Sequence, residues 1–129
     1  AVTADKLSDS STETENVKRR VAAAWVNFQG NGAVGIRDAY NVDSIDDLGN
    51  TGYYQVNFKR AFANNDFAMA GTARFVRNTN NTTATVQIHR NRDLDSGMTT
   101  THVIITTTYS TGTLFDSEYV GLIFFGELS

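Results

Sequence analysis

His89 and His102 are the two histidines of this 129-residue chain, and imidazole is a common metal ligand. A hairpin turning at residues 93–97, DLDSG, would place them nearly opposite each other, with Ile88 and Val103 facing inward. Two imidazoles make an incomplete metal site, which only a ligand from a symmetry-related copy could complete. The sequence therefore favours two solvated histidines on a hairpin, and it predicts no metal site and no cofactor.

The aspartates suggest two further kinds of chemistry, calcium binding and acid–base catalysis. Asp93, Asp95 and Gly97 resemble the start of a calcium loop, but no glutamate stands at the twelfth position, so a turn is favoured. Asp46 and Asp47 form a carboxylate pair, yet adjacent residues on a strand point to opposite faces, and a loop pair is usually solvated. The chain also contains no cysteine, no serine elbow, no P-loop and no His-Glu zinc motif. We therefore expect that it is not an enzyme.

Asparagines in two polar loops are the candidate ligand-binding residues. Their side chains offer hydrogen-bond donors and acceptors to sugar hydroxyls and lose little rotamer entropy when they become ordered. An alternative stays open, because asparagine also fills turns simply by tolerating left-handed backbone angles. The candidates are Asn64, Asn65, Asn78, Asn80 and Asn81.

Composition and charge argue against several classes of protein. The net charge is −3 and no basic stripe is present, which argues against nucleic-acid binding. No apolar run approaches the ~18 residues of a membrane span, so we expect no membrane insertion. The chain divides into a polar N-terminal arm over residues 1–20 and one domain over residues 21–129. The arm has three open interpretations: a disordered leader, an arm that orders against a neighbouring subunit or particle, or a short helix within residues 11–25.

After residue 21 the chain alternates apolar and polar residues in short runs, as half-buried strands do. Ala24, Val26 and Phe28 share one face of the first run, and Trp25 lies on the other. The glycines of residues 30–32 then predict a hairpin or tight corner. Later runs of the same kind are separated by clusters of Gly, Asn and Asp, and the chain contains no proline. The pattern predicts an all-β fold, an antiparallel β-sandwich of about seven or eight strands.

The last run, residues 119–125, has apolar side chains on both faces. Val120, Leu122 and Phe124 alternate with Tyr119, Ile123 and Phe125. One face can enter the core, but the other needs a cover, because a small antiparallel sandwich normally leaves one face of each sheet in water. We therefore expect self-association through an interface formed by Trp25, Tyr119, Ile123 and Phe125.

Trp25 and Arg37 are expected on the outer face of the sheet. Trp25 is most simply a large apolar anchor at a sheet edge or subunit seam, and a sugar-stacking platform is the alternative. Arg37 adjoins Asp38 on a strand whose inner positions are Val34 and Ile36. Its guanidinium is therefore expected to pair across the sheet with a carboxylate.

A series of short motifs extends over residues 20–58, with TADKLS before it at residues 3–8 and NNDFAMAGTA after it at residues 64–73. The motifs are WVNF at 25–28, GNG at 30–32, IR at 36–37, NV at 41–42, SI at 44–45, GNTG at 49–52 and VNF at 56–58. In this order they closely resemble a domain that recurs in tail-fibre and other virion structural proteins of tailed bacteriophages, especially marine and cyanobacterial ones. The resemblance covers roughly residues 3–75, and the remainder is matched only by general β character.

The resemblance implies a β-rich module of the virion surface, commonly trimeric and at the distal end of a fibre, with no catalytic residues to transfer. Such a module usually follows a long fibre shaft, whereas these residues hold the module alone. We therefore expect a non-enzymatic virion structural protein of the tail or capsid surface, a homotrimer that binds other virion proteins. The first expectation is a tail-fibre or tail-tip module that adheres to a host-surface glycan or protein. The alternative is a capsid decoration protein that clamps the shell.

Overall fold

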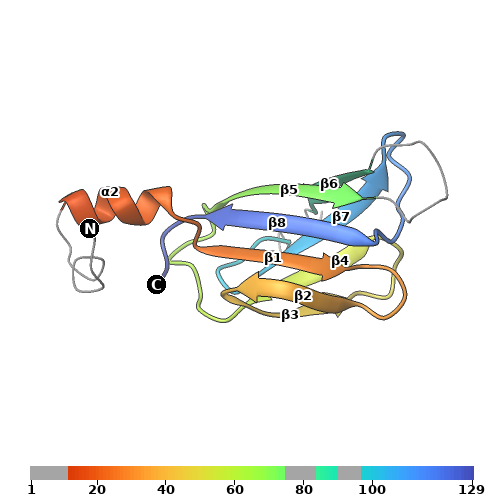
Figure 1. Cartoon of the computed structure of the whole chain (residues 1–129), viewed down its shortest axis with the longest axis horizontal. Coiled ribbons are helices and arrows are strands. Elements are labelled where there is room, and N and C mark those ends of the chain that lie inside the picture. Colours follow the sequence, from red (N-terminus) through yellow and green to blue (C-terminus); the bar gives the residue numbers. More distant parts are fainter. Residues whose placement is uncertain (1–11, 75–83, 90–96) are drawn as a thin grey trace.

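The computed structural model describes residues 12–74, 84–89 and 97–129, which form one helix and a single eight-stranded sheet (Figure 1). All neighbouring strands are antiparallel, in the order β2-β1-β8-β5-β6-β7-β4-β3, so the predicted all-β antiparallel fold is confirmed. Both sides of the core come from this one curled sheet rather than from two separate sheets. The elements are α2 (Thr12–Arg20), β1 (Ala24–Gln29), β2 (Gly35–Tyr40), β3 (Val42–Asp47), β4 (Tyr53–Phe58), β5 (Ala68–Arg74), β6 (Ala84–Ile88), β7 (His102–Tyr109) and β8 (Tyr119–Phe125).

The alternating sequence of the strands gives the sheet its inner and outer faces. In β1, Ala24, Val26 and Phe28 are buried, whereas Trp25 is exposed, as the sequence predicts. In β4 and β8 the buried residues also alternate along the strand: Tyr54, Val56 and Phe58, and Val120, Leu122 and Phe124. Because these rows all face one interior, the sheet curls around them and buries their apolar surface.

The strand order brings the two edges of the sheet to the same place. Within the described residues β2 pairs only with β1, and β3 pairs only with β4, so these two consecutive strands are the two edges. Asn41 alone separates them. The edges therefore start from a common corner, and both β1 and β2 come into contact with β3. The result is a nearly closed sheet in which β2 and β3 lie along one side (Figure 1).

Asn41 forms this corner with both its backbone and its side chain. Its φ angle is 56°, in the left-handed region, which asparagine tolerates better than most residues. Its Nδ2 lies 3.2 Å from the carbonyl oxygen of Ala23 and 3.2 Å from that of Arg60, and its Oδ1 accepts a 2.7 Å hydrogen bond from Arg60 N. Its own carbonyl accepts from Lys59 N at 3.2 Å. One residue thus joins the start of β1 to the end of β4.

Tyr54 holds the loops together at one end of the sheet. Its side chain is fully buried, and its hydroxyl lies 2.8 Å from Gly30 O and 2.9 Å from Asp116 Oδ1. The same carboxylate oxygen accepts a 2.8 Å hydrogen bond from Gly52 N. A Cβ at Gly30 would lie 2.6 Å from the tyrosine oxygen, so only glycine fits there. Burial, and then the neighbouring Asp116 carboxylate, raise the pKa of Tyr54 well above its usual value.

Of the three interpretations of the N-terminal arm, the structure contains the short helix, α2. Lys18, Arg19 and Arg20 occupy its last turn, where the helix dipole favours positive charge. The helix ends shortly before β1 and projects from one end of the sheet (Figure 1). Residues 1–11 lie outside the described part of the chain.

Replacing Asn41 should destabilise the fold in two separable ways. Asn41→Ala removes the side-chain hydrogen bonds and places an alanine in the left-handed region, so we expect a loss of about 2–4 kcal/mol in the free energy of unfolding. Asn41→Gly removes the same hydrogen bonds without the backbone cost, so it should lose about 1–2 kcal/mol less than the alanine variant. Urea denaturation of the three proteins measures both effects. Equal stability of the glycine and alanine variants would show that the backbone angle contributes nothing.

Tyr54→Phe should destabilise the protein by about 1–2 kcal/mol near neutral pH, because the buried Gly30 carbonyl oxygen and the half-buried Asp116 carboxylate lose their donor. Above about pH 10 the unfolded tyrosine loses its proton while the native one keeps it, so the wild type loses stability as the pH rises. The phenylalanine variant lacks this titration. The stability difference between the two proteins should therefore shrink between about pH 8 and about pH 11 in urea denaturation. A difference that stays constant over this range contradicts the assignment.

Candidate functional site

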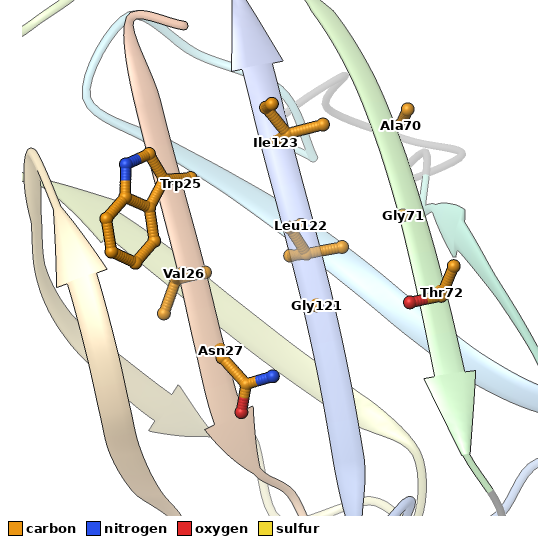
Figure 2. Close-up of a pocket in the computed structure, with 9 residues that line it drawn as sticks. All are labelled: Trp25, Val26, Asn27, Ala70, Gly71, Thr72, Gly121, Leu122 and Ile123. Carbon is orange, nitrogen blue, oxygen red and sulfur yellow. The ribbon is translucent and has the colours of Figure 1, made fainter.

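The candidate site is a shallow hollow on the outer face of the sheet, above the neighbouring strands β1, β8 and β5. It has a volume of about 350 Å³ and opens broadly to solvent. The register places Trp25 beside Ile123 and Ile123 beside Ala70, so the residues that line the hollow lie in rows that run across the three strands. Its lining residues are Trp25, Val26, Asn27, Ala70, Gly71, Thr72, Gly121, Leu122 and Ile123 (Figure 2).

Gly121 forms the floor of the hollow. It lies in the middle of β8, opposite Asn27 on one side and Thr72 on the other. Its neighbours in the sequence, Val120 and Leu122, are buried, so position 121 faces outward. A Cβ at this position would lie 3.5 Å from Thr72 Oγ1 and 3.9 Å from Asn27 Nδ2, which are ordinary contact distances. The fold therefore has room for a side chain here, and the glycine leaves that room empty.

Asn27 and Thr72 direct polar atoms toward this space from opposite sides (Figure 2). Arg37 Nη1 donates a 3.3 Å hydrogen bond to Asn27 Oδ1, and this contact determines that the Nδ2 end of the amide faces Gly121. Neither Asn27 Nδ2 nor Thr72 Oγ1 has a hydrogen-bond partner among residues 12–74, 84–89 and 97–129. An amide donor and a hydroxyl with unused hydrogen-bonding capacity thus converge above one glycine.

A stack of two arginines on a tyrosine lies next to the hollow. Tyr119 precedes Gly121 by two residues on the same face of β8, and its ring lies between two guanidinium groups. The Cζ atoms of Arg37 and Arg74 are 3.8 Å and 4.0 Å from the ring centroid. Arg74 pairs with the Glu118 carboxylate at 3.2 Å, and Arg37 Nη2 donates to the Glu118 carbonyl oxygen at 2.8 Å. These contacts hold Arg37 in place, and Arg37 in turn orients Asn27.

Four large exposed side chains lie on the outer face, and two of them, Trp25 and Ile123, also line the hollow. The exposed fractions are 37% for Trp25, 37% for Ile123 and 38% for Phe125. Tyr40, which is opposite Trp25 on β2, is 54% exposed. We call these four residues the apolar row. Within the described residues, Ile123 and Phe125 thus leave apolar surface of β8 exposed on the outer face of the sheet.

The residues predicted to form an oligomer interface lie on one face but in different surroundings. Trp25, Ile123 and Phe125 belong to the apolar row, whereas the ring of Tyr119 is covered by the two arginines. All four lie outside the core, as alternation requires, and their role in assembly stays a prediction.

Arg37 lies on the outer face as predicted, but the expected carboxylate partner is wrong. Its guanidinium donates to Asn27 Oδ1, to Gln29 Oε1 at 3.4 Å and to the Glu118 carbonyl oxygen. The reason is a bulge: Asp38 pairs with Asn27 and Ile36 with Phe28, which leaves Arg37 as an extra residue in β2. The bulge directs the side chain across β1 toward β8.

The two histidines lie in the other half of the sheet, His89 directly after β6 and His102 at the start of β7, and they are not opposite each other. Ile88 pairs with Ile105, and His89 N donates to Ile104 O at 2.8 Å. The predicted register is wrong because the chain reverses at residues 99–102, where Thr99 N donates to His102 O at 2.9 Å. His102 Nδ1 is 3.2 Å from Thr99 Oγ1, and the His89 ring meets the Tyr53 ring at 4.9 Å between centroids.

The aspartates of β3 make separate local contacts. Asp46 pairs in register with Gln55 and Asp47 with the buried Tyr54, so the two carboxylates point to opposite faces, as predicted. Asp46 Oδ2 accepts from Asn57 Nδ2 at 2.9 Å, and Asp47 Oδ1 accepts from Gly49 N at 3.0 Å. Asp93 and Asp95 lie outside the described residues. Across the ranges that are described, no group of three or more metal-ligating side chains could hold an ion, and no helix is long and apolar enough to span a membrane.

The candidate asparagines fall into two groups. Asn64 and Asn65 are exposed in the connection before β5, where Asn64 Oδ1 accepts from Asp66 N at 2.9 Å and Asn65 Nδ2 is 3.4 Å from Met98 O. The first contact is a local turn, which agrees with the turn-forming alternative. Asn78, Asn80 and Asn81 lie outside the described residues. Asn64 and Asn65 are not among the residues that line the hollow.

The sequence interpretation named Trp25 but missed Asn27, Thr72 and Gly121. The available signal was Gly121, because a glycine at an outward position inside an apolar strand often marks a place where something approaches the backbone. Its neighbours across the sheet could not be named, because they depend on long-range strand pairing.

In comparisons with known proteins, no protein-family model, no curated protein and no solved structure matches this chain.

Proposed function

We propose that this chain is a non-enzymatic structural module of a tailed-phage virion, in a tail fibre or tail tip, which contacts a host-surface ligand. The observation that carries the proposal is the hollow over Gly121, where two unpaired polar groups converge beside the exposed Trp25. The site is carried by paired strands, not by loops, so a ligand would meet a surface that is already ordered.

The resemblance to virion proteins supports the same site. Its WVNF motif is part of β1 and supplies Trp25 and Asn27, and its IR motif is part of β2 and supplies Arg37. The motifs therefore include the aromatic side chain, the amide and the arginine that orients the amide. We expect the motifs to contain these three side chains if the resemblance extends to the contact surface as well as to the fold.

We also propose that copies of the module assemble as a homotrimer. The support is the part of the apolar row that does not line the hollow, Tyr40 and Phe125, which are exposed and available to a neighbouring copy without covering Gly121. Burying such side chains between subunits removes apolar surface from water and favours association.

A capsid decoration protein is the second candidate, and helix α2 is the observation that favours it. The helix projects beyond the end of the sheet, so it is placed to reach a neighbouring shell subunit (Figure 1). Its last turn carries Lys18, Arg19 and Arg20, which would suit an acidic partner.

The location of the chain on an intact particle distinguishes these candidates. Antibody or gold labelling of this chain should mark the tail end of the virion if it is a fibre or tip module. Uniform labelling of the shell would reject that proposal in favour of the decoration protein. Hydrolysis of host polysaccharide that is lost on changing Asp46 or Asp47 would contradict both.

Light scattering tests the assembly. The wild type should have about three times the 14.1 kDa chain mass, and Phe125→Ser should shift it toward monomer or aggregate. Leu122→Ser is the contrasting variant, because Leu122 is buried in the core. Its replacement should lower the free energy of unfolding by roughly 3 kcal/mol or more and so unfold the domain. A wild-type mass that stays at that of one chain across micromolar concentrations contradicts the trimer.

A further inference from the structure

We infer that the hollow over Gly121 binds one uncharged pyranose unit of a glycan, an inference that rests on the proposed adhesive function and names its ligand class. Asn27 Nδ2 donates to a ring or hydroxyl oxygen of the sugar, and Thr72 Oγ1 exchanges a hydrogen bond with a neighbouring hydroxyl. Trp25 and Ile123 cover the C–H face of the ring.

The size and shape of the hollow fit a single sugar ring. Its volume of about 350 Å³ is at the small end of the range for ligand sites, which is roughly 300–1,000 Å³. The hollow is open to solvent on the outer face, so the neighbouring units of a polysaccharide can extend away on either side. A glycine floor allows the ring to approach the backbone of β8 where any other residue would hold it off.

The polar groups are arranged before any ligand arrives. Arg37 holds the Asn27 oxygen, and the stack on Tyr119 holds Arg37, so the amide nitrogen is already directed at the space above Gly121. Little side-chain entropy is then lost when a sugar binds. Thr72 approaches the same space from β5, and its hydroxyl can act as donor or acceptor.

The charges around the hollow favour an uncharged sugar over an acidic one. Arg74 is paired with Glu118, and Asp38 is opposite Asn27 on β2, next to Arg37. Two positive and two negative side chains therefore surround the site. A uronic or sialic acid would gain no net attraction there.

An apolar side chain of a second copy is the competing occupant. It would cover Asn27 Nδ2 and Thr72 Oγ1 without offering either a hydrogen bond, and a buried polar group without a partner is costly. A pyranose instead presents hydroxyl oxygens beside an apolar ring face, and so suits both the polar floor and the Trp25–Ile123 wall.

The experiment is an NMR titration of the full chain with the methyl glycosides of glucose, galactose, mannose and N-acetylglucosamine, and with methyl glucuronide as the charged comparison. We expect weak binding to at least one neutral glycoside, about millimolar per site. The Asn27 side-chain amide and the Trp25 indole N–H signals should shift.

Gly121→Ala should weaken binding at least tenfold, because its Cβ enters the space above the floor without disturbing the fold. Gly35→Ala is the matched control: a Cβ there meets nothing within 4 Å, and binding should be unchanged.

Asn27→Asp and Asn27→Ala separate the donor from the shape of the side chain. Aspartate keeps the size of the side chain but removes the donor, so both variants should lose binding to a similar degree, at least tenfold. Thermal unfolding of each variant shows whether the fold is intact.

Four results would overturn the inference. They are no binding of any neutral glycoside up to about 50 mM, signal shifts away from the hollow, tighter binding of the glucuronide, and unchanged binding in Gly121→Ala. A change in oligomer mass on Gly121→Ala, without any sugar binding in the wild type, would assign the hollow to a second copy. These outcomes are independent of where the chain is labelled on a particle, so a tail location without sugar binding rejects this inference and leaves the proposed function standing.

Discussion

Asn41 is the constraint on which the closure of the sheet depends. A single residue turns the chain from β2, which pairs with β1, to β3, which pairs with β4. Its left-handed backbone makes the turn possible, and its side chain forms hydrogen bonds with backbone groups of Ala23 and Arg60. One curled sheet can therefore enclose the core from both sides, without a second sheet to cover it.

The corner also affects the outer surface. It places β2 against β1, where the bulge at Arg37 turns the guanidinium over the Tyr119 ring and toward the Asn27 oxygen. The orientation of one exposed amide thus depends on a chain of contacts that begins with a backbone bulge. Side chains held in this way are typical of preformed sites, since the orientation of each is fixed by contacts with its neighbour.

Local alternation was enough to predict the strand character and the faces of β1 and β8, because burial on one side leaves a period of two in the sequence. It was not enough for β3, because Asp46 and Asp47 suggested a loop and the corner at Asn41 was not predicted. A possible signal was the asparagine itself, which tolerates the left-handed region better than other residues within a run of strand formers.

The predicted histidine register was wrong for a different reason, since the reversal at residues 99–102 lies within a threonine-rich segment that has no glycine. The site escaped the sequence interpretation because Asn27, Gly121 and Thr72 meet only through the pairing of β8 with both β1 and β5.

That pairing has a consequence for how the protein folds. β8 lies between β1 and β5 in space but follows both in the sequence (Figure 1). The pairs β1–β2 and β3–β4 can form early from nearby residues, whereas Trp25 meets Ile123 only after nearly all of the described chain has been synthesised. Contacts so distant in sequence close slowly, because the loop entropy is lost before any pairing compensates for it. Until β8 arrives, β1 and β5 each have a free edge and an uncovered apolar face. The nascent chain is therefore most open to aggregation, or to pairing with a neighbouring copy, during the interval just before β8 is added.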